Sequence, residues 1–229
     1  MLTQLLYSTN MLKLAEKEQV ILLEILPRIF GYYSLLAGIN QAKLPLLTSA
    51  TNVRKNIIIY PPCTKSDEMV HEYSTITCAL STLPFLPESI DLILLSHLLE
   101  QYQDQNTILN EAYNTLINGG HLILIGFNHS WLHKIFNRSN PKRHSTNAKK
   151  IIRILIQQGF EIEEQHKIIP TLTNNSSLTA KIGAFFASLY LSSYIIVAKK
   201  SKMVLPKMKI NYGQTAIESL PKPTSKVIS

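Results

Sequence analysis

Residues 89–128 read SIDLILLSHLLEQYQDQNTILNEAYNTLINGGHLILIGFN, and this stretch decides the fold. An almost continuous apolar run, residues 90–95, predicts a buried strand. Asp104 predicts the N-cap of a helix with one apolar face, and the glycine pair 119–120 is expected to end that helix. Residues 121–127 predict a second buried strand. Strand, crossover helix and strand form a βαβ unit, which predicts a parallel sheet with helices on its faces.

The spacing of apolar residues predicts further helices and strands on both sides of this unit. Apolar residues at helical spacing predict a first helix over residues 11–26. A further helix is expected over about residues 148–158, ending at Gly159. Residues 74–80 form a weaker strand candidate. The other expected strands are residues 32–39, 55–60, 160–169 and 193–199.

Bulk composition supports one domain. A chain of 229 residues that is 45% hydrophobic is long enough to bury one substantial core. Beyond residue 200 the periodicity ends and prolines recur, so we expect one domain at residues 1–200, which includes the first helix, and a disordered basic tail at 201–229. The first ten residues lack the pattern of a secretory signal, which predicts a cytoplasmic protein. Cys63 and Cys78 have no CxxC spacing and predict ordinary reduced thiols.

The charge distribution and the hydropathy of the chain bear on nucleic-acid and membrane binding. Much of the net charge of +8 lies in residues 134–150 and in the tail. Nucleic-acid binding is an alternative there, but solvated charge is favoured because the interleaved aromatic residues of a single-strand binder are absent. Residues 182–198 carry no charge, yet a membrane-spanning helix needs about 20 mostly apolar residues. This run is shorter and contains serines, so we expect a buried element and no membrane association.

Four motifs follow one another in a fixed order: Leu83-Pro84-Phe85, residues 89–94 (SIDLIL), residues 97–100 (HLLE) and residues 118–124 (NGGHLIL). Their order and spacing resemble the central block of class I S-adenosylmethionine-dependent methyltransferases of the methyltransferase type 11 group. The resemblance implies an α/β fold, a Rossmann-like sandwich with a mostly parallel seven-stranded sheet and helices on both faces. It also implies methyl transfer to an unidentified acceptor, either a small molecule or a macromolecule.

The resemblance further implies where S-adenosylmethionine would lie, beyond the carboxyl ends of the strands at the switch point of the sheet. His97, just past the fourth strand, is the candidate general base, and a histidine hydrogen-bonded at a strand end is the alternative. The residues implied for cofactor binding are Ala37, Gly38, Tyr60, Ala79, Leu80, Thr82, Leu83 and Ser96.

The cofactor motif departs from the family pattern. Leu36 stands where the family has an acid, and Asn40 stands where a second glycine is expected. Tyr60 occupies the end of the second strand without the acid that binds the ribose, and Ala79 replaces the acid at the adenine. Each lost charge-assisted bond removes about 1.5–3 kcal/mol. The alternative function is therefore a binding or scaffold protein that keeps the fold without the cofactor.

The sequence contains further candidate site residues. His129 is a second candidate base, with a structural role in a loop as the alternative. His129 and His133 have i, i+4 spacing but no evident third ligand, so no metal site is predicted. Trp131 indicates core or lid packing rather than contact with an acceptor. The acidic residues expected on the solvated side of the first helix are Glu16, Glu18 and Glu24.

Overall fold

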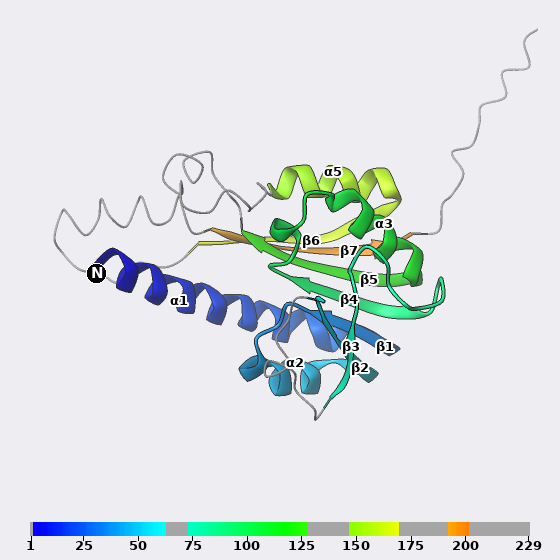
Figure 1. Cartoon of the computed structure of the whole chain (residues 1–229), viewed down its shortest axis with the longest axis horizontal. Helices are drawn as coiled ribbons and strands as arrows, with labels where there is room; N and C mark the ends of the chain where they lie inside the picture. The colour runs from blue at the N-terminus through cyan, green and yellow to red at the C-terminus, as the bar shows by residue number, and fades with distance from the viewer. Residues whose placement is uncertain (1, 63–72, 128–146, 170–191, 202–229) are drawn as a thin grey trace, which may run out of the picture.

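The computed structural model describes residues 2–62, 73–127, 147–169 and 192–201, and a seven-stranded sheet lies at its centre (Figure 1). Strands β1 to β5 pair in parallel, whereas β7 runs antiparallel to both β5 and β6. The predicted mostly parallel seven-stranded sheet is therefore confirmed. In spatial order the strands are β3 (Ser74–Thr77), β2 (Asn52–Tyr60), β1 (Phe30–Ala37), β4 (Ile90–Ser96), β5 (Leu116–Phe127), β7 (Ser193–Lys200) and β6 (Phe160–Ile168).

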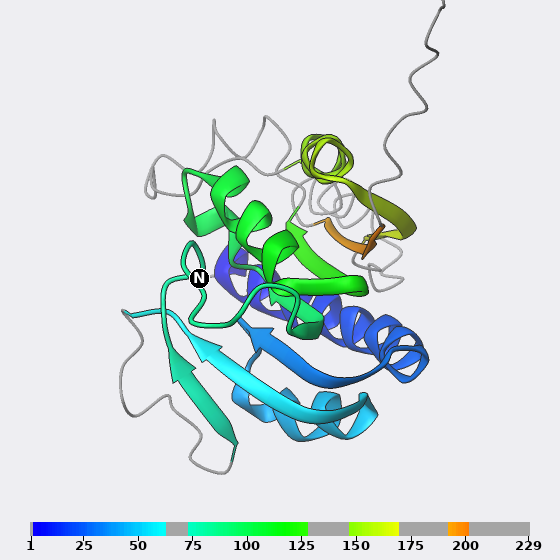
Figure 2. The same ribbon diagram turned by 90° about the vertical axis from the view of Figure 1, so that its right-hand side faces the viewer.

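Helices cover both faces of the sheet (Figures 1 and 2). Side chains that alternate along each strand divide into two hydrophobic cores. Leu35 and Leu95 pack on one face, and Leu36 and Leu94 pack on the other. Burial on both faces explains why the strands read as nearly continuous apolar runs. The helices are α1 (Leu2–Ile25) and α2 (Leu44–Ala50) on one face, and α3 (Gln105–Thr115) and α5 (Ala148–Gln158) on the other.

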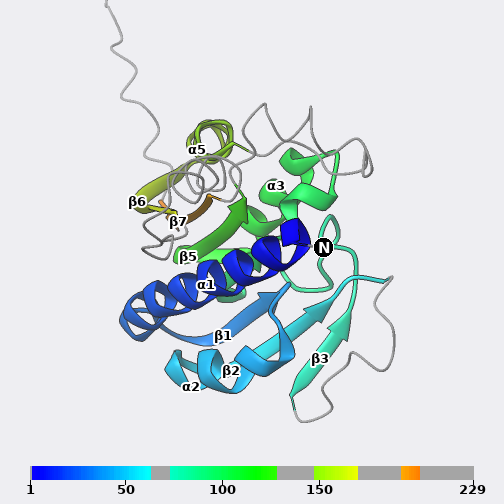
Figure 3. The same ribbon diagram turned by 90° about the vertical axis from the view of Figure 1, so that its left-hand side faces the viewer.

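Helix α1 is the longest element and crosses one face of the sheet (Figure 3). It begins well before residue 11, where the apolar spacing predicted a start, and it ends at Ile25. Leu14, Leu22 and Ile25 are buried because they share the face that lies on the strands. A short 3-10 turn, Leu26–Arg28, then reverses the chain into β1.

The glycine pair 119–120 has a different role from the predicted one. Helix α3 ends at Thr115 and β5 begins at Leu116, so both glycines lie inside β5. The register between β4 and β5 shifts at this irregularity, where Gly119 has a φ of 85°. A left-handed residue lets a strand accommodate extra residues, and glycine adopts that conformation without strain. The prediction that these glycines end the helix is therefore wrong.

Two helix signals are confirmed. Asp104 caps α3, because its side chain accepts a hydrogen bond of 3.2 Å from the backbone N–H of Thr107. Helix α5 spans the predicted residues and ends at Gly159, which has a left-handed φ of 100°. The backbone N–H of Gly159 donates to the carbonyl of Ile156 at 3.1 Å. The C-terminal glycine signal was thus sufficient to locate the end of α5.

Several predictions concern residues outside the described ranges. These are the tail from residue 202 onward, Cys63, His129, Trp131 and His133. The uncharged run 182–198 is described only in its last part, where it contributes to the buried strand β7. Among the described residues, no helix combines the length and the apolar character that a membrane span requires.

Replacing Gly159 with alanine tests this helix end. We expect the change to lower the free energy of unfolding by about 1–2 kcal/mol, because a side chain destabilises the left-handed conformation. The added Cβ would also lie 2.9 Å from the hydroxyl oxygen of Tyr113. Urea denaturation measures the effect. Gln157→Ala, at an exposed position of the same helix, is the control and should change stability by less than about 0.5 kcal/mol. Equal stability of the two variants would contradict the assignment.

Candidate functional site

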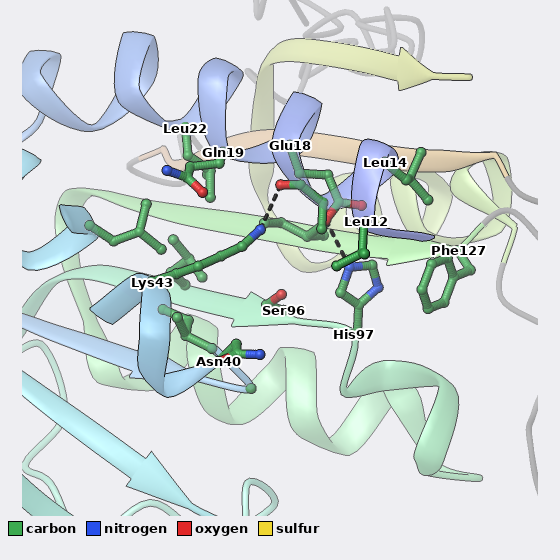
Figure 4. A pocket seen from close by; sticks show the side chains of 16 residues that line it. Leu12, Leu14, Glu18, Gln19, Leu22, Asn40, Lys43, Ser96, His97 and Phe127 are labelled. Atoms are coloured by element: carbon green, nitrogen blue, oxygen red, sulfur yellow. Dashed lines mark hydrogen bonds and ion pairs between the residues drawn. The ribbon is translucent and has the colours of Figure 1, made fainter. Parts of the chain in front are cut away.

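A cavity of about 220 Å³ lies between α1 and the carboxyl ends of β1, β4 and β5 (Figure 4). Open parallel sheets bind their ligands beyond the carboxyl ends of the strands. Leucines and isoleucines form a large part of the cavity wall, and Phe127 adds an aromatic ring. Its polar side chains are Glu18, Gln19, Asn40, Lys43, Ser96 and His97.

The position of Gly38 fixes the floor of this cavity. Parallel pairing of β1 with β4 ends at Ala37 and Leu95, so the next residues of both strands meet at the sheet edge. Gly38 has a φ of 75°, and a Cβ placed there would lie 2.0 Å from the carbonyl oxygen of Ser96. No side chain fits in that space. Gly38 therefore serves first to pack the turn after β1 against the end of β4.

His97 follows β4 in a constrained conformation. Its φ is 52°, in the left-handed region that residues other than glycine seldom adopt. The backbone N–H of His97 donates to the carbonyl of Ile125 at 2.8 Å. The imidazole stacks on the ring of Phe127, with centroids 4.1 Å apart and planes at 25°. Contacts from β5 thus hold His97 in a strained backbone conformation. Residues in such conformations occur most often at functional sites.

Glu18 of α1 reaches the same histidine. One carboxylate oxygen, Oε2, lies 3.1 Å from Nε2 of His97 (Figure 4). The Glu18 side chain is only 8% exposed. The prediction that Glu18 lies on the solvated side of the helix is therefore wrong, whereas Glu16 and Glu24 are exposed as expected.

The sequence did contain a signal for the burial of Glu18. Leu14 precedes it by four residues and Leu22 follows it by four, and both are buried. Residues four apart lie on the same face of a helix, so Glu18 belongs to the stripe that covers the sheet. A carboxylate within an apolar stripe indicates a buried polar contact rather than a solvated one.

Two polar atoms of this pair remain without a hydrogen-bond partner. They are Oε1 of Glu18 and Nδ1 of His97, and both are buried. Most buried polar atoms in proteins are hydrogen-bonded, to protein or to ordered water. Glu18 and His97 thus keep unused hydrogen-bonding capacity next to the cavity.

Lys43 brings a positive charge to the cavity from the 3-10 turn Gln41–Lys43. Its Nζ donates to the carbonyl of Ala15 in α1 at 2.6 Å. Burial lowers the pKa of Lys43 below its ordinary value of 10.5, although the carboxylates of Glu18 and Glu16 favour the charged form. Lys43 and Glu18 are not within the 4.0 Å of an ion pair. Two opposite charges thus face the cavity without neutralising each other directly.

A second buried carboxylate fixes the end of β5. Glu100 lies in the 3-10 turn Leu99–Gln101 and is 3% exposed. Its Oε1 accepts a hydrogen bond of 2.6 Å from the backbone N–H of Phe127. The ring of Phe127 in turn stacks on His97. Glu100 therefore supports the site from the opposite face of the sheet without lining the cavity.

The residues that the resemblance implied for cofactor binding do not all meet. Gly38 and Ser96 line the cavity together with His97. Ala37 is fully buried in the core on the α3 side, and Tyr60 packs in the core on the α1 side. Leu80 and Leu83 surround a separate apolar void of about 10 Å³, under α3. Ala79 and Thr82 line neither space.

No metal centre appears in the part of the chain that the structure describes, since no three His, Cys, Asp or Glu residues gather there. His129 and His133 lie outside these ranges.

The strand order and the cavity at the strand ends define the class I methyltransferase fold, which confirms the resemblance found in the sequence. The sequence matches the family model for a methyltransferase domain over residues 53–124. A comparison with curated protein sequences finds no match.

Solved structures share this fold at low sequence identity. A methyltransferase from Mesorhizobium loti, described as S-adenosylmethionine-dependent, has a TM-score of 0.56 and 14% identity, covering 78% of this chain and 95% of that one. Haemonchus contortus phosphoethanolamine N-methyltransferase 2, solved with phosphomonomethylethanolamine and S-adenosylhomocysteine, has a TM-score of 0.62 and 16% identity, covering 81% and 53%. The 4+2 cyclase SpnF has a TM-score of 0.59 and 14% identity, covering 82% and 81%. A cyclase among these structures shows that the fold alone does not fix the reaction.

Replacing Lys43 with methionine tests the buried cation. In the folded state Lys43 has a lowered pKa, so between that value and about 10.5 the unfolded chain binds more protons. By linkage, the cost of burying this charge is fully present below the folded pKa and disappears as pH rises toward about 10.5. We therefore expect the stability of the wild type, relative to Lys43→Met, to increase as the pH rises toward about 10.5.

Urea denaturation at several pH values measures this difference. Lys167→Met, at an exposed position of β6, is the control and should show no such trend. A wild type that loses stability relative to Lys43→Met as pH rises would contradict the lowered pKa.

Proposed function

We propose that the chain is an S-adenosylmethionine-dependent methyltransferase whose reaction takes place at the cavity beneath α1. The observation that carries the proposal is that Gly38, Ser96 and His97 meet at the carboxyl ends of β1 and β4, where this fold binds its ligands. The match of residues 53–124 to a methyltransferase domain supports it. The Haemonchus contortus enzyme, which has the same fold, was also solved with S-adenosyl-L-methionine.

The described residues fit one end of this cofactor. Its amino-acid end carries a carboxylate and an ammonium group. Lys43 and Glu18 bring to the cavity the opposite charges that these two groups need. Its ribose has no carboxylate partner at Tyr60, the last residue of β2. The residues that follow, 63–72, lie outside the described ranges. Lys43 and Glu18 would therefore hold the amino-acid end, and Gly38 would form the floor beneath it.

The cofactor, when bound, supplies an electrophilic methyl group. The chain must align the acceptor and take its proton where the acceptor carries one. An ionised carboxylate only accepts hydrogen bonds, so Glu18 favours the tautomer of His97 that carries its proton on Nε2. Nδ1 is then the atom that can accept a proton, and it has no other hydrogen-bond partner. These contacts support His97 as the general base.

A second candidate function is a binding protein that retains the fold but no longer uses the cofactor. Three observations favour it. The end of β2 brings no acid among the described residues, and Leu80 and Leu83 are packed around a void of only about 10 Å³. Cavities that hold drug-sized ligands measure about 300–1,000 Å³, which exceeds the 220 Å³ beneath α1. This protein would bind a smaller ligand at the same site.

Calorimetric titration distinguishes the two functions. If the chain is a methyltransferase, S-adenosylmethionine and S-adenosylhomocysteine should bind to the wild type with saturable heat. Ala15→Leu adds three carbon atoms to the cavity wall and should weaken binding by roughly tenfold or more. Ala42→Leu is the matched control, because Ala42 is exposed and does not line the cavity.

Absence of heat in the wild type at millimolar concentrations would reject the methyltransferase and favour the binding protein. Equal affinities in Ala15→Leu and Ala42→Leu would place the cofactor outside this cavity. Circular dichroism before each titration confirms that the variants are folded. Gly38 is unsuitable for this test, because any side chain there meets the Ser96 carbonyl.

A further inference from the structure

A two-stranded ribbon projects from the amino end of the sheet. Pairing of β1 with β2 begins at Phe30, whereas pairing of β1 with β4 begins only at Ser34. On the other side, β2 pairs with β3 only from Ile57 onward. Among the described residues, 30–33 and 52–55 therefore pair with each other and with no further strand. This ribbon lies at the end of the sheet where α1 ends, opposite the cavity (Figure 1).

Three aromatic side chains of this ribbon are exposed. Phe30 is 73% exposed, Tyr32 is 64% exposed and Tyr33 is 42% exposed. No other aromatic side chain whose exposure the structure describes is exposed. Aromatic side chains contribute large apolar areas to cores and to interfaces, so three exposed rings at one place indicate a binding surface.

Asp91 closes the edge of the ribbon that faces β4. Its Oδ2 accepts hydrogen bonds of 2.9 Å from the backbone N–H groups of Tyr32 and Tyr33. Gly31 makes room for this carboxylate, because a Cβ at Gly31 would lie 2.3 Å from the Cβ of Asp91. A partner that added a strand would need these N–H groups, and they are already occupied. The ribbon therefore offers its side chains rather than its backbone.

Cationic side chains accompany the aromatic rings. The guanidinium carbon of Arg54 lies 6.0 Å from the centre of the Tyr32 ring. Lys55 pairs in register with Tyr33, so these two side chains are neighbours on the other face of the ribbon. Arg54 and Lys55 are both exposed, and neither forms an ion pair with a described residue. Their charges are therefore available to an anionic ligand.

We propose that this ribbon is a binding surface for single-stranded nucleic acid. Proteins that bind single strands combine cationic side chains, which contact the phosphates, with aromatic rings on which the bases stack. The ribbon combines both, because Arg54 and Lys55 of β2 lie beside the aromatic side chains of β1. The basic residues 134–150 lack such interleaved aromatic residues. Strand pairing thus brings together here what that basic segment does not offer.

The spacing of two rings favours a single strand over a duplex. Phe30 and Tyr32 lie on the same face of the ribbon, because they are two residues apart in a strand. Their separation along the strand is about 6.6 Å, whereas the bases of a duplex stack at about 3.4 Å. An unpaired strand can separate neighbouring bases and place one on each ring. A duplex keeps its bases stacked on each other.

Charge favours nucleic acid over a protein partner. Tyrosine and arginine are enriched at protein interfaces as well, so the aromatic residues alone do not decide between the two. The ribbon has two cations without ion-pair partners among the described residues, and the nearby Asp91 is occupied by backbone donors. The net charge of +8 also attracts a polyanion to the chain. Phosphate groups are therefore the better match.

Fluorescence anisotropy of the full chain with labelled oligonucleotides tests the binding. The probes are oligouridylate, oligothymidylate and a mixed-sequence DNA duplex, each of about 12 nucleotides in length, which is within the site sizes of single-strand binders. We expect a single strand to bind roughly tenfold or more tightly than the duplex, because only unpaired bases reach the rings. The first two probes distinguish RNA from DNA as the source of the strand.

Variants at Tyr32 separate stacking from other contacts. Tyr32→Ser should weaken binding of the single strand by roughly fivefold or more, whereas Tyr32→Phe keeps the ring and should stay within about twofold of the wild type. Ile156→Ala is the matched control, because Ile156 is 59% exposed on α5, outside the ribbon. Circular dichroism and urea denaturation confirm that each variant is folded.

Salt dependence separates the phosphate contact from general attraction. Arg54→Gln should weaken binding and reduce the slope of log affinity against log salt concentration by about 0.7, because one phosphate contact is lost. Tyr32→Ser should leave this slope unchanged. Arg153→Gln removes the same charge from an exposed position of α5 and should change neither the affinity nor the slope.

Nucleic-acid binding at the ribbon does not depend on the proposed methyl transfer, because the ribbon and the cavity lie at opposite ends of β1. All titrations are therefore made without S-adenosylmethionine. A preference for single strands that is lost in Tyr32→Ser and kept in Tyr32→Phe supports the proposal. Equal affinity for single strand and duplex, or equal losses in Arg54→Gln and Arg153→Gln, would overturn it. The absence of any binding would also overturn it and favour a protein partner.

Discussion

The close approach of Gly38 to the end of β4 is the constraint on which the site depends. A Cβ at Gly38 would lie 2.0 Å from the Ser96 carbonyl oxygen, so the turn after β1 can rest on β4 only without a side chain. This contact sets where β1 ends relative to His97. It also directs the next turn, with Lys43, toward α1. The glycine that resembles a cofactor motif thus also has a packing role, because it lets the turn after β1 rest on the end of β4.

The fold was largely predictable because its signals are local. Residues 90–95 and 121–127 read as buried strands because both of their faces are covered, and Gly159 marks a helix end by its conformation. The glycine pair 119–120 misled the prediction because a left-handed glycine serves a strand irregularity as well as a helix end. Sequence alone does not distinguish these uses, since the difference lies in the pairing of β5 with β4.

The site was less predictable because it is assembled from separate elements. Ser96 ends a recognisable strand and His97 follows it, so their location could be predicted. Glu18 was assigned to solvent, although its spacing from Leu14 and Leu22 placed it on the buried face. Lys43 gave no signal, because a lysine in a short turn is usually exposed. What sequence reasoning lacked was the position of α1 over the strand ends, which is a tertiary relation.

The polar groups of the cavity reduce stability in a way that packing does not explain. Glu18 and His97 each leave a buried atom without a partner, and Lys43 keeps its charge under partial burial. An apolar residue at Glu18 would continue the stripe of Leu14 and Leu22 at no such cost. The left-handed backbone of His97, with its φ of 52°, further reduces the stability of the folded chain. These destabilising features lie together at one end of the sheet, while both cores remain apolar. Such a concentration is typical of a site organised for a ligand. Under the proposed function, the absence of acids after β2 and β3 and the presence of charges beneath α1 are compatible, because they would meet different ends of the cofactor.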